Sequence, residues 1–274
     1  MTFHVLTLFP EMFASLLSQS MIKSAIDNGV IRVSVVNIRD FATDKHKTAD
    51  DYPFGGGPGM VMKPEPVFLA AESVLGSGAG AGPGGGAGGA GGADAGGGAG
   101  AGAGRGGDVP VILLSPQGRR FDQRAACELA TRREIVLVCG HYKGVDERIR
   151  QHLATDEISI GDYVITGGEL AAMVVIDAVT RLRPGVLGDF ASAETDTFYR
   201  GLLEHANYTK PRDFRGHAVP EVLVGGNHEE IRRWRRRDSL RRTLVRRPDL
   251  LESAEITAED KRFLEEIRAG LNRN

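Results

Sequence analysis

Short apolar runs alternate along the chain with stretches whose apolar positions follow helical spacing. The apolar runs predict buried strands at residues 3–9, 31–37, 111–114, 135–139 and 157–160. The amphipathic stretches predict helices at residues 11–18, 21–28, 64–75, 122–131, 146–153 and 168–183. Because strands and helices alternate, we predict an α/β fold with a mostly parallel sheet and helices on both of its faces.

Two further regions interrupt this alternation. From Gly76 to Gly107 the sequence is almost entirely glycine and alanine, which offers little to bury and predicts a flexible surface insert. After Pro184-Gly185 the periodicity is lost as far as Gly201. We therefore predict a first domain at 1–185, an interdomain linker at 186–201 and a helical C-terminal domain at 202–274. Asn227 and Thr257, each three residues before an acidic residue, are predicted helix N-caps of that domain.

The formal net charge of −2 over 274 residues conceals a strongly basic segment. Arginines are concentrated between Arg232 and Arg247, around the only tryptophan of the chain. A solvated helix face paired with nearby acids is one interpretation of this run. The other is a surface that binds phosphates and stacks on the bases of RNA.

Cysteine usage and hydropathy are typical of a cytoplasmic protein. No apolar run approaches the roughly 20 residues that cross a bilayer, and the first residues lack the pattern of a signal peptide. Cys127 and Cys139 fall in a helical and a strand-like pattern, which favours buried, reduced thiols. A disulfide or metal role for them is the alternative.

A glycine-rich segment at residues 55–59 does not match the common phosphate-binding loops. It has no Gly-Lys-Ser/Thr ending, and it is not a G-x-G-x-x-G sequence between a strand and a helix. Kinase and dehydrogenase functions are therefore disfavoured. A tight turn is the alternative to a ligand-binding role.

Three small-residue loops follow predicted strands, at residues 114–118, 140–144 and 160–169. Ligands of open α/β sheets bind at the carboxyl ends of the strands. Small residues there leave backbone N–H and C=O groups accessible to a purine, and Tyr142, Tyr163 and Ile165 provide apolar walls. We expect the three loops to form one pocket, although turns that only pack together have a similar pattern.

Six motifs give the chain a specific resemblance to a known family. They are Leu8-Phe9-Pro10-Glu11-Met12-Phe13, Gly55-Gly56-Gly57-Pro58-Gly59-Met60, Ser115-Pro116-Gln117-Gly118, Ser159-Ile160-Gly161-Asp162-Tyr163, Gly167-Gly168-Glu169-Leu170 and Gly226-Asn227-His228-Glu229-Glu230. In order and spacing they resemble those of bacterial tRNA (guanine-N1)-methyltransferases of the knotted SPOUT superfamily. The resemblance covers nearly the whole chain apart from the Gly/Ala insert.

The resemblance implies methyl transfer from S-adenosylmethionine to N1 of the guanine immediately 3′ of the anticodon of tRNA, which supports reading-frame maintenance. It also implies a deep trefoil knot, which general folding rules argue against. A homodimer is expected, in which the linker and C-terminal domain of the partner complete each active site. The positions that match the methyl-donor site are Leu114, Ser115, Pro116, Gly118, Gly140, Tyr142, Gly144, Ile160, Gly161, Tyr163, Ile165, Gly167 and Gly168.

Two residues match the catalytic positions of the family. Asp196 corresponds to the general base at guanine N1, and Arg181 to the cation that stabilises charge on O6. Taken alone, Asp196 is more typical of a helix cap and Arg181 of an exposed charge at a helix end, and it is the family context that favours the catalytic roles.

The resemblance also implies positions that meet tRNA. They are His46, Asp50, Gly55, Gly56, Gly57, Gly59, Asn227, His228, Arg232 and Arg233. Asp50 as a loop cap and His228 as an ordinary first-turn residue are the alternatives. His141 and Lys143 depart from the Arg and Glu of many relatives, and because that Glu is associated with Mg²⁺, the lysine puts magnesium dependence in doubt.

Three other functions account for only part of the sequence. A non-catalytic RNA-binding protein on the same scaffold is disfavoured because both Asp196 and Arg181 are present. Knotted methyltransferases that act on other atoms lack the C-terminal Gly-Asn-His segment. An enzyme of small nucleotides does not account for the concentration of arginines.

Overall fold

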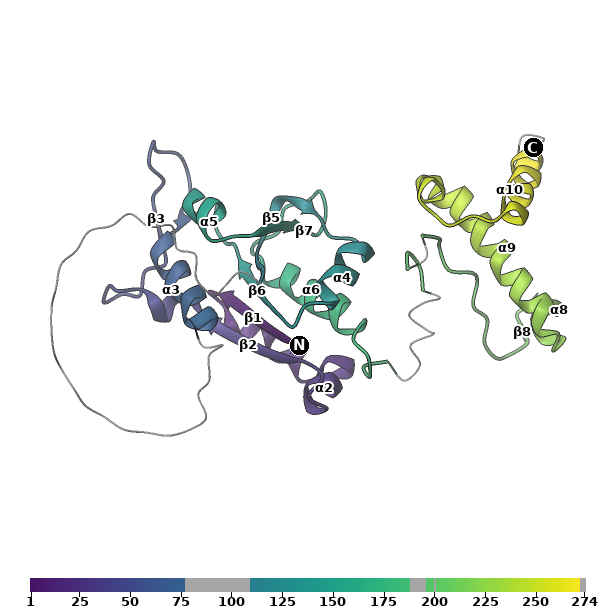
Figure 1. The fold of residues 1–274 in the computed structure, drawn as a ribbon, viewed down its shortest axis with the longest axis horizontal. Helices are drawn as coiled ribbons and strands as arrows, with labels where there is room; N and C mark the ends of the chain where they lie inside the picture. Colours follow the sequence, from purple (N-terminus) through teal and green to yellow (C-terminus); the bar gives the residue numbers. More distant parts are fainter. Residues whose placement is uncertain (77–108, 188–195, 200, 272–274) are drawn as a thin grey trace. The chain divides into compact units, whose positions relative to one another are not determined.

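The computed structural model describes residues 1–76, 109–187, 196–199 and 201–271. The chain divides into two compact units, Met1–Val186 and Leu187–Asn274 (Figure 1). The predicted Gly/Ala insert, apart from Gly76, lies outside the described residues, as do residues 188–195 and 200 of the predicted linker. Within the described part, no helix combines the length and apolarity needed to cross a bilayer.

The first unit is built on a five-stranded sheet. Its strands are β1 (Thr2–Thr7), β2 (Arg32–Asn37), β5 (Val111–Arg120), β6 (Glu134–Cys139) and β7 (Asp156–Ser159). Their order is β2-β1-β6-β5-β7, and every neighbouring pair is parallel. The predicted α/β class with a mostly parallel sheet is confirmed. A two-residue pair, β3 (Asp50–Asp51) and β4 (Val61–Met62), is antiparallel and too short for a sequence pattern to reveal.

The helices of this unit are α2 (Ser20–Asp27), α3 (Pro64–Leu75), α4 (Gln123–Ala130), α5 (Glu147–His152) and α6 (Glu169–Thr180). A 3-10 turn, η2 (Ile38–Phe41), follows β2. The single helix predicted at residues 11–18 is wrong. A 3-10 turn, η1 (Pro10–Phe13), comes first and a one-turn helix, α1 (Ala14–Leu17), follows it. Proline at the first position and 3-10 geometry are both common where a helix begins.

Alternation along the strands explains how the sheet is covered. Leu6 and Val138 pack in one buried cluster with Val67 of α3 and Ile149 of α5. Because successive side chains of a strand point to opposite faces, the equally buried Val5 and its neighbours face the other side. Helix α6 contacts β1 and β6 and packs with α2 and α4 there (Figure 1). The sheet is therefore buried on both faces, as parallel sheets are.

The second unit contains a short hairpin and helices. The hairpin pairs β8 (Asp213–Phe214) with β9 (His217–Ala218), and the helices are α8 (Glu221–Val224), α9 (His228–Arg246), the 3-10 turn η4 (Pro248–Glu252) and α10 (Ala258–Leu271). The Asn227 side chain accepts from the N–H groups of Glu229 and Glu230, so the predicted cap of α9 is confirmed. Leu202, Leu240 and Leu264 form a small buried core.

Candidate functional site

A cavity of about 230 Å³ lies where β6 and β7 end, beside the irregular middle of β5. These three strands are neighbours in the sheet, so the loops that follow them meet at one edge. The structure brings together in the lining of this cavity all the residues predicted for the methyl donor except Gly118. They are Leu114, Ser115, Pro116, Gly140, Tyr142, Gly144, Ile160, Gly161, Tyr163, Ile165, Gly167 and Gly168.

Gly118 lies behind the cavity wall. The predicted strand end at residue 114 is wrong, because β5 continues to Arg120 with a register shift between Leu114 and Arg119. A Cβ on Gly118 would lie 2.4 Å from the backbone nitrogen of Ile158 in β7. The irregular strand therefore needs glycine at this position, and its close approach to β7 holds the Ser115–Gln117 wall in place.

The other two loops touch each other through their backbones. The N–H of Gly168 donates to the carbonyl of Gly140 at 2.8 Å. A Cβ on Gly168 would lie 2.7 Å from the Cα of Cys139, so only glycine permits this approach. The contact places backbone groups of both loops at the cavity.

Tyr142 adopts an unusual backbone conformation at the mouth of the cavity. Its φ of 59° lies in the left-handed region, which costs a residue with a side chain about 1 kcal/mol. Arg39 donates to the Tyr142 hydroxyl at 3.3 Å, and the His141 ring lies 5.2 Å from the Tyr142 ring. Strained residues of this kind gather at ligand-binding sites.

Sequence reasoning missed several residues of the lining, among them Val145, Arg150, Ile158 and Ala171. Arg150 lies on α5, where its only sequence signal was helical spacing. It is paired with Glu157 of β7 at 3.0 Å. Ile158 is part of a strand whose pattern indicated burial, which is true of core and cavity residues alike.

The glycine-rich loop lies beside the cavity. A Cβ on Gly59 would lie 2.9 Å from Cγ of Lys143, and the N–H of Lys143 donates to the carbonyl of Met60 at 3.0 Å. Four glycines of this loop have positive φ, which accounts for their abundance by turn geometry: Gly55, Gly56, Gly57 and Gly59. Asp50 pairs with Met62 in the β3–β4 ladder, and His46 is exposed.

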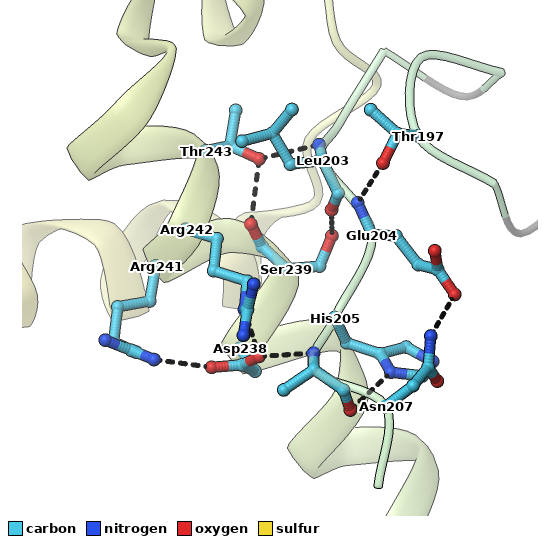
Figure 2. A network of polar contacts seen from close by, with 11 residues as sticks. Thr197, Leu203, Glu204, His205, Asn207, Asp238, Ser239, Arg241, Arg242 and Thr243 are labelled. Atoms are coloured by element: carbon cyan, nitrogen blue, oxygen red, sulfur yellow. Dashed lines mark hydrogen bonds and ion pairs between the residues drawn. The ribbon is translucent and has the colours of Figure 1, made fainter.

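The two predicted catalytic residues belong to different units. Arg181 is the C-cap of α6 in the first unit. Asp196 lies in the second unit, where its carbonyl accepts from the N–H of Tyr199 at 3.3 Å. The neighbouring Thr197 accepts from the N–H of Glu204 at 3.0 Å, so the segment with Asp196 is attached to the chain that follows it (Figure 2).

A polar network fixes this segment on helix α9 (Figure 2). The carboxylate of Asp238 accepts from the N–H of Ala206 and from Arg241 at 2.7 Å, and from Arg242 at 2.8 Å. Burial of Asp238 raises its pKa, but the hydrogen bonds from Arg241, Ala206 and Arg242 outweigh burial and hold the pKa below its ordinary value. Thr243 adds a hydroxyl that accepts from the N–H of Leu203 at 2.9 Å.

Three arginines of α9 pair with buried aspartates, and two others line a groove. Arg236, Arg241 and Arg242 are paired with buried aspartates, Arg236 with Asp260 at 2.8 Å. Arg232 and Arg233, predicted to meet tRNA, are exposed and line a groove between α9 and α10. Of the other two predicted residues here, Asn227 has a structural role as the cap of α9, and His228 is the exposed first residue of that helix.

Both cysteines are free thiols. Burial raises the pKa of the Cys139 thiol well above its ordinary value, and the nearby carboxylate of Glu169 raises it further. Cys139 is therefore a protonated core residue behind the cavity, as its strand-like pattern predicts.

Comparison with known proteins identifies the family of this chain. The model of the tRNA (Guanine-1)-methyltransferase TrmD family matches residues 1–81 and 84–253. The chain is 55% identical over 263 residues to a tRNA (guanine-N(1)-)-methyltransferase of Moorella thermoacetica, covering 96% of this chain and 95% of the relative. Proteins with the same name from Dehalococcoides mccartyi strain CBDB1 and Bacillus cereus strain AH820 are 51% and 49% identical, over 99% and 98% of this chain and 99% and 100% of the relatives. Both findings agree with the motifs that line the cavity, and the chain belongs to the tRNA (guanine-N1)-methyltransferase family.

Proposed function

We propose that this chain transfers a methyl group from S-adenosylmethionine to N1 of the guanine immediately 3′ of the anticodon in tRNA, a modification that supports reading-frame maintenance. The observation that carries the proposal is the cavity at the ends of β6 and β7 and beside the irregular middle of β5, in a chain of this family. The substrate is then tRNA, and the chain is an enzyme rather than only an RNA-binding protein.

The chemistry of the cavity fits the proposed methyl donor. Its glycines leave backbone N–H and C=O groups accessible for the edge of an adenine. Gly140 also packs tightly against β5, because a Cβ there would lie 3.3 Å from the carbonyl oxygen of Leu114. Ile160 and Ile165 provide apolar surface for the ring. When bound, S-adenosylmethionine supplies a methyl group on a positively charged sulfur, which leaves as a neutral thioether.

Asp196 and Arg181 carry out the proton and charge chemistry of the proposed reaction. Guanine N1 carries a proton and is a weak nucleophile at neutral pH, so the Asp196 carboxylate accepts that proton as N1 takes the methyl group. Negative charge that develops on O6 during this transfer is stabilised by the Arg181 guanidinium. Arg181 lies at the C-terminal end of α6, whereas the cavity residue of this helix, Ala171, lies in its first turn, so this assignment rests on the family pattern.

The proposed assembly is a homodimer with a trefoil knot in the strand-following loops. Residues 1–185 form the donor-binding domain, 186–201 the linker and 202–274 the tRNA-binding domain, and each active site is completed by the partner. Two exposed apolar residues of α6, Leu170 and Val174, support a partner surface on the first domain.

The proposed tRNA contacts come from both domains. His46, Asp50 and the glycine-rich loop meet the target base, and Arg232 and Arg233 bind phosphates of the anticodon arm. Lys143 lies beside the glycine-rich loop, and its positive charge stands where the resemblance implies a glutamate associated with Mg²⁺. We therefore propose transfer that does not depend on magnesium.

Nucleoside mapping tests the proposed function. Unmodified tRNA transcripts, with guanine or with adenine 3′ of the anticodon, are incubated with the full chain and labelled S-adenosylmethionine and then digested. Label in 1-methylguanosine from the guanine transcript alone is the expected result. Binding of both transcripts without transfer would favour an RNA-binding protein, and label on another atom would favour a different knotted methyltransferase.

A further inference from the structure

A buried carboxylate stands behind the cavity. Glu169 is the first residue of α6, and only 1% of its surface is exposed. Its Oε1 accepts a hydrogen bond of 2.7 Å from the hydroxyl of Thr7. A carboxylate is buried without large cost only where donors compensate for lost water. The N-terminus of α6 and the Thr7 hydroxyl provide that compensation.

Thr7 connects this carboxylate to the turn after β1. It is the last residue of β1 and is completely buried. Its Oγ1 donates to Glu169 and accepts from the N–H of Phe9 at 2.9 Å. The motif that begins at Leu8 and the motif that ends at Leu170 are thus joined by two hydrogen bonds through one hydroxyl, although neither bond touches the cavity.

On its other side, Glu169 faces two residues of the cavity lining. The point where a Cβ of residue 167 would lie is 2.3 Å from Oε2 of Glu169 and 2.7 Å from Nε2 of His141. The carboxylate and the imidazole therefore meet on the side of Gly167 where a side chain would otherwise lie. Gly167 and His141 are also paired as a backbone bridge, and the His141 ring lies 4.9 Å from the ring of Phe9.

We propose that Thr7 and Glu169 are positioning residues of the methyl-donor cavity. Their hydrogen bond holds the start of α6 against the end of β1. The fixed start of α6 in turn holds in place the Gly167-Gly168 backbone and the His141 ring, which line the cavity. Neither residue touches the ligand, so each acts through the lining. This inference rests on the proposed function, because the ligand it concerns is S-adenosylmethionine.

A purely structural role for the pair makes a different prediction. If the bond only stabilises the fold, its loss lowers the melting temperature and leaves the affinity of the folded chain unchanged. If it positions the lining, its loss weakens S-adenosylmethionine binding at temperatures where every variant is folded. Loss of one hydrogen bond to a charged group corresponds to about a tenfold change or more.

The test compares three threonine variants by calorimetric titration of the full chain with S-adenosylmethionine. Thr7→Val removes the hydroxyl at nearly constant shape, and Thr7→Ser retains it. Thr180→Val is the matched control, because Thr180 is equally buried and lies in α6, and its hydroxyl has no hydrogen-bond partner among the described residues. We expect about tenfold weaker binding for Thr7→Val, and binding within about twofold of wild type for the other two.

Steady-state kinetics and a double-mutant cycle complete the test. Thr7→Val should raise KM for S-adenosylmethionine about tenfold and leave KM for tRNA and kcat within about twofold. In a Glu169→Gln background Thr7→Val should have a smaller effect than in wild type, since the two residues act as one unit.

The outcomes separate this inference from the proposed function. A folded wild type that does not bind S-adenosylmethionine would overturn both. A wild type that binds, with Thr7→Val binding equally well or Thr180→Val as weak as Thr7→Val, would overturn this inference alone.

Discussion

A single added methyl group at Gly118 should distort the methyl-donor cavity. A Cβ at this position would lie 2.4 Å from the backbone nitrogen of Ile158 and 2.5 Å from the carbonyl oxygen of Glu157. Atoms of this kind are in comfortable contact at about 3.5 Å, so β5 and β7 would have to separate by about 1 Å. The added Cβ is fixed to the β5 backbone and the atoms that it meets are backbone atoms of β7, so no side-chain rotation relieves the contact.

Separating β5 from β7 should lower both the stability of the fold and the affinity of the cavity for its ligand. Overpacking an interior costs about 1–3 kcal/mol, and a displacement of about 1 Å in a site lowers its efficiency by up to about 100-fold. We therefore expect Gly118→Ala to bind S-adenosylmethionine at least about tenfold more weakly, with a lower melting temperature.

Calorimetric titration and thermal unfolding of the full chain measure both effects. Gly76→Ala is the control, because a Cβ there has nothing within 4 Å and its φ is not positive. If Gly118→Ala matched the wild type in affinity and in melting temperature, the close approach of β5 to β7 could not be what shapes the cavity wall.

Three further predictions concern charged residues. Asp238→Asn should lower the free energy of unfolding of the second unit by about 2 kcal/mol at neutral pH. Because the folded pKa of Asp238 is lowered, the stability difference between wild type and variant should persist down to about pH 4 and shrink at lower pH. Denaturant titrations in which this difference did not change with pH would contradict the stabilising role of the Asp238 carboxylate. Arg232→Ala should reduce the slope of log affinity for tRNA against log salt concentration by about one. Arg236→Ala should instead mainly destabilise the fold, because it removes the ion pair with Asp260. Equal slopes for Arg232→Ala and wild type would exclude a phosphate contact by Arg232. Wild-type transfer should be unaffected by a chelator and Lys143→Glu transfer should depend on magnesium, so identical magnesium responses would argue against the role of Lys143.

The sheet could be predicted from the sequence because its strands are buried on both faces. Continuous apolar runs such as residues 135–139 identify strands of this kind, and alternation with helices indicates that they are parallel. The path of β5 beyond Leu114 could not be predicted. Its last residues are polar, proline or glycine, and they remain in the sheet only through an irregular pairing with β7 that no periodicity reveals.

The candidate site also has features that the sequence pattern predicts and features that it does not. Glycines after three strands indicated a cavity, because parallel neighbours bring such loops to one edge. Glu169 was visible only as part of a motif, since a buried glutamate and an exposed one at a helix start have the same pattern. Its burial depends on Thr7, a contact between residues 162 positions apart in the sequence. Contacts at that separation are set by the topology, which the local pattern does not contain.

Methyl transfer from labelled S-adenosylmethionine to unmodified tRNA that carries guanine 3′ of the anticodon should be measured with wild type and Asp196→Ala side by side. We predict label at N1 of that guanine with wild type and a loss of at least about 100-fold in rate with the variant, which should still bind the methyl donor. No transfer by a folded wild type that binds S-adenosylmethionine, or equal transfer by Asp196→Ala, would contradict the account.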